Sequence, residues 1–496
     1  MNRRDALAAT ATGALQFAAP QGLAQTRRER LVLGMALEPS PGLDPTSGAA
    51  SAIGEVVLYN IFETLTKINP DGSVSPLLAE SWEASPDLKT CTFRLKRGVR
   101  FQNGEPFTAA TVKFSFDRAG AQNSINKDKR TFASLLTRVV DDHTVVLINS
   151  AIEPDLPFLL GQASAAIVEP KSADTNATRP IGTGPYQLQK WNKGLSITLA
   201  KWDGWRNANA IRLKSATIRF IPDPAAQVAA LLAGDVDVIP RVTSRAVPQF
   251  LSHPGFQVLT ANSRAKTVLA INNRRKPLDD VRVRRAIAAA IDRKAVIQGA
   301  AEGYGVPIGS YYVPGDFGYI DLTGVNPYDP EQARALLKAA GVNAPLELTI
   351  TLPPPTYARQ AGEVIVSQLA KAGIQAKLEN VEWANWLSSV YGGAHHYDLT
   401  IVSHAEPFDL DNFDKPDYYW GYSSPKFKAL YGKYRNAQRA AERRQLVGEI
   451  QRLLAEDAVL AYLYQPQWVT IAVKGLKGLW KDMPIFANDL SALSWG

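Results

Sequence analysis

A short apolar run followed at once by a dense group of acidic residues constrains this chain more than any other feature. Residues 399–402, Leu-Thr-Ile-Val, are partly β-branched, which is typical of a buried strand. Glu406, Asp409, Asp411 and Asp414 follow within a few positions. In open α/β sheets, ligands lie at the edge where strands end, so these carboxylates are candidate binding groups. The alternative is a solvated acidic loop in which Asp409 or Asp411 caps the next turn.

Segments with helical periodicity alternate with short apolar runs along the chain. Apolar residues recur at helical spacing in residues 279–294, 330–340 and 364–372, and residues 31–35 and 92–95 are predicted strands. At 496 residues, the chain has room for about three domains. Alternation without a repeat period indicates the α/β class with mixed sheets.

The first 25 residues have the composition of an export signal. Arg3 and Arg4 precede a weakly apolar, alanine-rich segment that ends in small residues near Ala24, as at a cleavage site. The paired arginines favour the twin-arginine route, and an ordinary Sec signal is the alternative. No apolar run reaches the roughly 18–20 residues of a membrane span. We therefore expect the mature chain to be exported to the periplasm.

The cysteine content argues against disulfides and thiolate metal sites, and the distribution of charge argues against binding of nucleic acid. Cys91 is the single cysteine, so neither an intramolecular disulfide nor a thiolate metal cluster can form. Cys91 lies in an alternating stretch, where a buried small hydrophobic residue is expected. The formal net charge is +8, but basic residues form tight groups only at 27–28 and 282–285. Because no basic stripe is interleaved with aromatic residues, a nucleic-acid partner is not expected.

Short motifs occur in a fixed order along the chain. They are PLLAESW at 76–82, SPD at 85–87, TFRLKRGVRF at 92–101, NGEPFTA at 103–109, GTGPY at 182–186, ALLAGDVDVI at 230–239, PLDDVRVR at 277–284 and NPYDP at 326–330. Through these motifs the chain resembles the extracytoplasmic solute-binding proteins of family 5, the peptide-, opine- and nickel-binding type that includes dipeptide- and oligopeptide-binding proteins. The resemblance extends along nearly the whole mature chain.

This resemblance implies a two-lobed periplasmic-binding-protein fold, of type II and similar to cluster C, with a central ligand cleft. Lobe I would comprise residues 30–53, 172–264 and 475–496, and an additional subdomain of lobe I would comprise residues 54–171. Lobe II would comprise residues 265–474. The chain would then cross between the lobes near Ala265 and return near Lys474, and the lobes would close on a ligand by a hinge.

The resemblance also implies the function and the partners. The chain would be a monomeric, non-catalytic component of an ABC importer that captures a peptide, a peptide-like molecule or another cationic small solute. It would deliver this ligand to a permease complex in the inner membrane. No cofactor is expected.

The acidic loop corresponds to the loop that holds the amino group of the ligand in peptide-binding members of the family. Alignment on Asp409-x-Asp411 places Glu406 at the anchor position, where family members have aspartate. The longer side chain moves the charge by about one methylene, which is enough to change which ligands fit. Leu352 stands where dipeptide binders have an arginine for the carboxylate of the ligand, and Arg359 is the substitute.

Aromatic residues near the acidic loop are candidates for the walls of the cleft. Trp383 and Trp386 follow a predicted strand, and core packing is the alternative role for both. The other candidates around the site are Tyr357, Tyr418, Tyr419, Trp420 and His404.

Two alternative functions remain open at this point. His395, His396 and His404 lie close to the acidic loop, but adjacent histidines rarely both reach one ion, so we predict no metal site and keep a metal-chelate receptor as an alternative. The other alternative is an exported hydrolase that uses Glu406 and Asp409 as its acid and base. No HExxH, GxSxG or Ser-x-x-Lys motif supports it.

Overall fold

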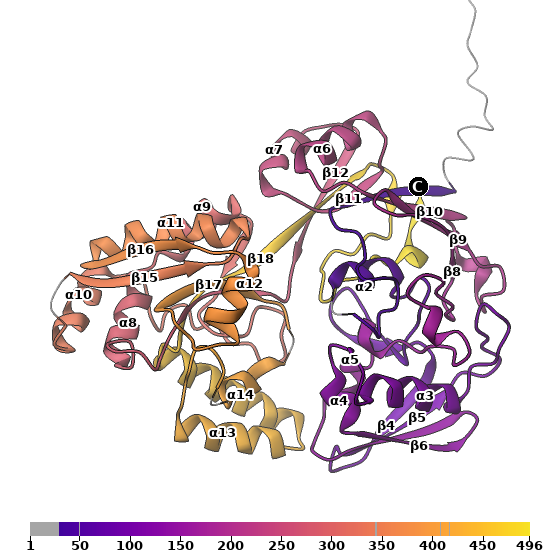
Figure 1. Ribbon diagram of the computed structural model, residues 1–496, viewed down its shortest axis with the longest axis horizontal. Coiled ribbons are helices and arrows are strands. Elements are labelled where there is room, and N and C mark those ends of the chain that lie inside the picture. The colour runs from indigo at the N-terminus through magenta and orange to yellow at the C-terminus, as the bar shows by residue number, and fades with distance from the viewer. Residues whose placement is uncertain (1–28, 49, 343–344, 407, 416) are drawn as a thin grey trace, which may run out of the picture.

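The computed structural model describes residues 29–48, 50–342, 345–406, 408–415 and 417–496. The predicted export signal at residues 1–25 lies outside this part of the chain. Helices and strands form two lobes that lie beside each other and are joined by the long strand β18 (Leu460–Val473) (Figure 1). The predicted α/β class and the two-lobed architecture are confirmed.

Strand β18 belongs to the sheets of both lobes. Its first part pairs antiparallel with β13 (Lys266–Ile271), and its later part pairs with β12 (Phe256–Asn262) and β11 (Val238–Val242). The result is one continuous 12-stranded sheet that runs through both lobes. Beside β18, strand β12 passes into β13 through residues 263–265, so two adjacent strands link the lobes. Such a pair of strands is suited to hinge motion.

Lobe I is built on β1 (Arg30–Met35), which lies between β11 and β10 (Ser215–Phe220) and pairs parallel with both. Strand β1 confirms the strand predicted at residues 31–35, and its alternate side chains Leu31, Leu33 and Met35 are buried because they pack in the core of lobe I. The other elements of this lobe are β8 (Tyr186–Asn192), β9 (Ser196–Lys201), β19 (Leu476–Lys477), β20 (Ser494–Trp495), α2 (Ser51–Val57), α6 (Pro224–Ala233) and α7 (Pro248–Leu251).

The additional subdomain has a four-stranded antiparallel sheet in the order β4-β5-β7-β6 and a separate hairpin of β2 and β3. Cys91 lies in its strand β5 and is buried, as predicted. The elements are β2 (Thr66–Ile68), β3 (Val74–Pro76), β4 (Ala79–Ala84), β5 (Thr90–Leu95), β6 (Leu135–Asp141), β7 (Thr144–Asn149), α3 (Ala109–Gly120), α4 (Lys129–Ala133) and α5 (Leu156–Leu159).

Lobe II contains the strand that was predicted from residues 399–402. This strand, β17 (Leu399–His404), lies between β13 and β15 (Leu346–Leu352), and its side chains pack into a core on each face of the sheet, which explains its continuous apolar run. The other elements are β14 (Gly305–Pro307), β16 (Ile374–Asn380), α8 (Val281–Ala289), α9 (Arg293–Ala301), α10 (Pro330–Ala339), α11 (Thr356–Lys371), α12 (Trp383–Trp386), α13 (Pro425–Asn436) and α14 (Ala440–Glu456).

The helix predicted at residues 279–294 is in fact two helices, α8 and α9. Asp292 stands between them, and its side chain accepts hydrogen bonds from the backbone N–H groups of Lys294 and Ala295. An aspartate that caps a new helix in this way competes with continuation of the preceding one. The arginines here have structural partners: Arg284 is buried and donates to the carbonyl oxygens of Leu278, Asp279 and Asp457.

We propose domain boundaries that follow the strand pairing and the core packing. The first crossing lies at residues 263–265, and the return lies within β18 between Tyr464 and Gln467, where the pairing partner changes, instead of near Lys474. Helix α2 packs in the core of lobe I, whereas Leu65 begins the core of the subdomain. We therefore begin the subdomain near Leu65 instead of at residue 54.

Candidate functional site

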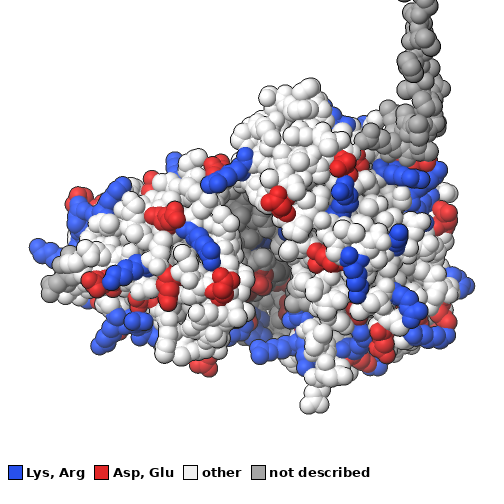
Figure 2. Space-filling model, turned by 45° about the horizontal axis from the view of Figure 1, so that its top comes forward, with Lys and Arg blue, Asp and Glu red and all other residues white. Residues whose placement is uncertain are grey.

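A cavity of about 270 Å³ lies between the two lobes. Lobe I and its subdomain contribute residues from α2 and from the segments around Lys127 and Gln162, and lobe II contributes Ala405 and Glu406. Arg264, in the first crossing, lies at the junction. Figure 2 shows the molecule hollowed between the lobes at this place. A cavity that both lobes line is one that a hinge motion opens and closes.

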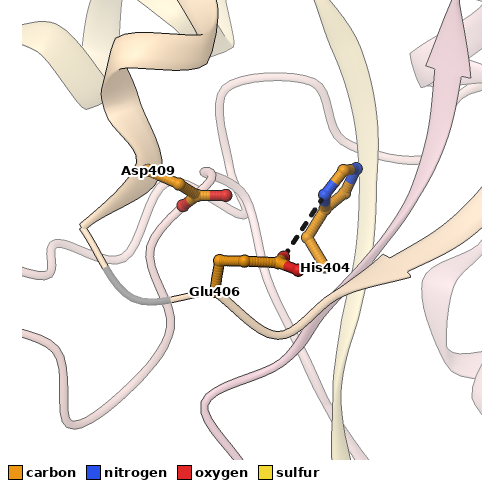
Figure 3. A group of neighbouring side chains, drawn as sticks. All are labelled: His404, Glu406 and Asp409. Atoms are coloured by element: carbon orange, nitrogen blue, oxygen red, sulfur yellow. Dashed lines mark ion pairs between the residues drawn. The ribbon is translucent and has the colours of Figure 1, made fainter. Parts of the chain in front are cut away.

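Glu406 follows the end of β17 and carries the carboxylate that lobe II presents to this cavity. Its side chain is 69% exposed, and its Oε2 accepts a hydrogen bond from the backbone N–H of Ala405 over 3.1 Å. In Figure 3 the carboxylate is turned toward the imidazole of His404, whose Nδ1 lies 3.8 Å from Oε2. Because no lysine or arginine side chain is paired with it within the described residues, this carboxylate can receive a cation from the cavity.

The interaction with His404 lowers the pKa of Glu406 to about 2, against the opposing effect of burial. Since the folded-state pKa lies below the ordinary value of 4.5, ionised Glu406 favours the folded protein above pH 4.5, and this contribution is lost as the pH falls through about 2. We therefore expect the carboxylate to stay ionised when the pH is lowered from 7 to 4.

Carbon-detected NMR of the Glu406 carboxyl group checks this expectation. Its chemical shift should stay constant between pH 7 and pH 4, whereas an unperturbed glutamate with a pKa near 4.3 becomes about two-thirds protonated by pH 4 and its chemical shift moves accordingly. A titration midpoint near that ordinary value would contradict the assigned role of His404. In His404→Ala, the midpoint should move toward the ordinary value.

Asp409 differs from Glu406, because both its carboxylate oxygens are bound within the protein. Its Oδ1 lies 2.7 Å from the Lys266 ammonium, and its Oδ2 accepts from the Tyr311 hydroxyl at 2.8 Å and the Asn412 amide at 3.4 Å. Asp409 and Lys266 are both buried. Breaking a buried pair by drawing one partner to a ligand leaves an uncompensated charge, which is costly. Asp409 therefore orders the loop and does not face the cavity.

The predicted aromatic residues lie mainly in the interior of lobe II. Trp386, Tyr419 and His404 are buried, and the Tyr419 hydroxyl lies 2.9 Å from Nε2 of His404. The Trp386 indole donates to the hydroxyl of Thr400. Trp383 is 42% exposed on α12 but is not among the residues that line the cavity.

Tyr357 and Arg359, both on α11, are also held by neighbours outside the cavity. The Tyr357 hydroxyl accepts a hydrogen bond from the backbone N–H of Ser403 over 3.0 Å, which ties α11 to β17. The Arg359 guanidinium lies 3.8 Å from the carboxylate of Glu382. Of the predicted ligand-binding residues, Glu406 is the one that the geometry brings to the cavity.

Sequence reasoning missed the rest of the cavity wall. The apolar side chains of this wall are Ile53, Leu58, Leu159, Trp468, Met483, Ile485 and Phe486. Two cationic side chains also line the cavity, and each is paired with a carboxylate. Lys127 lies 3.1 Å from Asp128, which lines the cavity too, and Arg264 donates to Asp316 over 2.9 Å. These residues come from separate segments that meet only when the lobes assemble. The one available signal was the position of Arg264 beside the crossing predicted at Ala265.

His404, Glu406 and Asp409 form a group whose potential metal-ligand atoms all lie within 4.8 Å of one another (Figure 3). Imidazole and carboxylates are suitable ligands for zinc and related ions. The Lys266 ammonium, however, already pairs with the carboxylate of Asp409 and neutralises its charge. The group as it stands therefore does not favour a divalent cation.

Two lobes around a cavity, with one exposed carboxylate against apolar walls, define a receptor for a small solute. The chain belongs to the family described as "Bacterial extracellular solute-binding proteins, family 5 Middle", which it matches over residues 73–429. Members of this family bind solutes for ABC importers. The chain is therefore the solute-binding component of such an importer, and it acts together with an ABC permease.

Individual binding proteins that are similar to this chain belong to the same class of receptor. The dipeptide-binding protein of Escherichia coli (strain K12) is 32% identical over 414 residues, which cover 76% of each chain. The glutathione-binding protein GsiB of Salmonella choleraesuis (strain SC-B67) is 28% identical over 358 residues, 71% of this chain and 69% of that protein. The solved structure of AgaA from A. tumefaciens R10 in complex with agropinic acid superimposes with a TM-score of 0.78 at 28% identity, over 94% of this chain and 99% of AgaA.

Proposed function

We propose that the ligand is a short peptide or a peptide-like small solute with a cationic amino group, and that Glu406 binds this group in the cleft. The observation that carries the proposal is the exposed carboxylate of Glu406 at a cavity with apolar walls. An ammonium group pairs with a carboxylate through charge-assisted hydrogen bonds. The names of the dipeptide- and glutathione-binding relatives support this ligand class.

We also propose that the protein binds its ligand without catalysing a reaction. A hydrolase would need one of its two carboxyl groups to donate a proton near neutral pH. The pKa of Glu406 is lowered to about 2, and the carboxylate of Asp409 is bound to the Lys266 ammonium. Neither group is suited to act as the acid.

We propose a periplasmic monomer that reaches its compartment by the twin-arginine or the Sec route, and that docks onto a permease complex in the inner membrane. Within the described residues, none of the helices has the length and apolar character that a membrane crossing requires. The apolar side chains of the cavity wall favour a ligand that has a nonpolar part as well as its amino group.

Native mass spectrometry of the protein purified from its own host, followed by a thermal-shift screen of the molecules found, tests the ligand. A ligand at a hundredfold excess over its dissociation constant stabilises the folded state by about 2.7 kcal/mol. In Glu406→Gln, the affinity for an amine-bearing ligand should fall at least about tenfold, because a charged hydrogen bond is replaced by a neutral one.

Glu382→Gln is the matched control, because Glu382 is an exposed glutamate whose partner is Arg359 and which does not line the cavity. It should leave the affinity unchanged. Equal affinity of the wild-type protein and Glu406→Gln for the ligand would show that another residue is the anchor. Failure of every amine-bearing peptide or peptide-like solute to stabilise the wild-type protein would contradict the proposed ligand class.

A further inference from the structure

The group formed by His404, Glu406 and Asp409 combines the side-chain types of a transition-metal site with the position of an amine-binding anchor. Its potential ligand atoms lie within 4.8 Å of one another, one on an imidazole and two on carboxylates. Three converging N and O ligands of these types are enough to hold a zinc or nickel ion, with solvent completing the coordination. Some further feature must therefore decide whether this site accepts a metal ion or an organic cation.

Lys266 is the residue that can make this decision. It lies on β13 directly opposite His404 on β17, and its side chain is 3% exposed. Its Nζ donates to Asp409 Oδ1 over 2.7 Å and to the backbone oxygen of Glu406 over 2.5 Å. The ammonium also lies 4.7 Å from the centre of the Tyr311 ring. These contacts hold a fixed positive charge inside the group and bind the chain on both sides of residue 407.

The contacts of Lys266 determine which carboxylates of the His404, Glu406 and Asp409 group are neutralised. Lys266 neutralises Asp409, and Lys127 pairs with Asp128, so among the described carboxylates that line the cavity Glu406 is the one without a lysine or arginine partner. A divalent ion bound by all three side chains would have to displace the ammonium from Asp409 and would then lie beside it in a poorly solvated place. Like charges so close together are strongly unfavourable. An organic ammonium needs only Glu406 and leaves the Lys266–Asp409 pair intact.

We propose that Lys266 is a specificity-determining residue, which reserves the anchor for an organic ammonium group by keeping divalent metal ions out of the His404, Glu406 and Asp409 group. This inference rests on the proposed function, since it assumes that Glu406 is the ligand anchor. It assigns Lys266 two effects: the charge that excludes a second cation at Asp409, and the hydrogen bond that fixes the backbone of Glu406.

The test compares metal binding by the wild-type protein, Lys266→Met and Lys266→Arg, with zinc and nickel ions as the probes in isothermal titration calorimetry. The wild-type protein and Lys266→Arg should show no saturable binding that depends on His404. Lys266→Met, which frees Asp409, should show saturable zinc binding at least about 10- to 100-fold tighter than the detection limit set by the wild-type protein, the range by which groups behind metal ligands change affinity. With cobalt, Lys266→Met should acquire a ligand-field absorption band that a second change, His404→Ala, removes.

Lys266→Gln provides a second variant if loss of the buried partner prevents Lys266→Met from folding. Its amide retains a donor for Asp409 but carries no charge, so it too should gain zinc affinity. A wild-type protein that binds zinc through His404 would overturn the proposal, as would folded Lys266 variants that bind zinc no better than the wild-type protein.

The outcome is separable from that of the proposed function. Stabilisation of the wild-type protein by amine ligands with no gain of metal binding in the variants would leave the receptor role intact and remove the role of Lys266. Gain of metal binding without any amine ligand for the wild-type protein would support the exclusion of metals by Lys266 and contradict the proposed ligand class.

Discussion

Trp386→Ala should lower the free energy of unfolding of lobe II by about 3–5 kcal/mol, the cost of removing a large aromatic side chain from a core. Trp386 is 3% exposed, its ring stacks on Tyr391 at 5.8 Å, and its indole N–H donates to Thr400 over 2.9 Å. The Thr400 hydroxyl in turn donates to the carbonyl oxygen of Thr351, so the indole completes a buried link between α12 and two strands. Its removal leaves both a cavity and an unpaired acceptor.

Trp383→Ala is the matched control, since Trp383 lies one turn earlier on the same helix and is 42% exposed. Trp383 contacts Trp386 edge to face, at 5.5 Å between ring centres, so its removal should lower the free energy of unfolding by at most about 1 kcal/mol. Denaturant unfolding followed by circular dichroism measures both changes. Equal destabilisation by the two substitutions would contradict the assignment of Trp386 to the core.

Arg443→Met should weaken ligand binding by roughly 30- to 150-fold, because it removes a contact that holds the two lobes together. Arg443 on α14 of lobe II binds Asp155, just before α5 of the subdomain, over 3.1 Å, and the side chain of Arg443 is 9% exposed. Nearby, Phe158 and Phe408 meet edge to face at 5.2 Å between ring centres. Loss of one partner of a partly buried pair costs about 2–3 kcal/mol, and every 1.4 kcal/mol is tenfold in affinity.

The reduced affinity should result from a less stable closed conformation and not from a lost ligand contact, since Asp155 and Arg443 do not line the cavity. Burial raises the pKa of Asp155, and the adjacent Arg443 opposes this effect. Small-angle scattering should show that Arg443→Met remains more extended than the wild-type protein in the presence of ligand.

Arg444→Met is the control for this prediction. Arg444 is the neighbouring arginine, and its guanidinium lies 4.7 Å from the centre of the Phe317 ring on the same lobe. It should bind ligand as the wild-type protein does. If Arg443→Met closed and bound ligand normally, Asp155 and Arg443 would have no part in closure.

The ordered motifs determined much of the fold from sequence, because each encodes a local packing requirement. In GTGPY, a Cβ on Gly182 or Gly184 would collide with the backbone oxygens of Ile61 or Asn60, so the glycines let two chain segments approach closely. The apolar run at 399–402 correctly predicted a central strand, since Leu399 and Ile401 pack into the core on one face of the sheet and Val402 into the core on the other. The ends of helices were harder to predict from the sequence, as the cap at Asp292 shows.

The sequence also determined that a carboxylate-rich loop would follow β17, and it placed Glu406 and Asp409 in that loop. Only the tertiary structure decided which of the two lines the cavity. Lys266, 143 positions before Asp409, is brought opposite the loop by the pairing of β13 with β17, and it neutralises Asp409 alone. The same packing put Trp386 in the core and left Trp383 at the surface. Charge compensation and burial depend on neighbours that are distant in sequence, and local pattern cannot specify them.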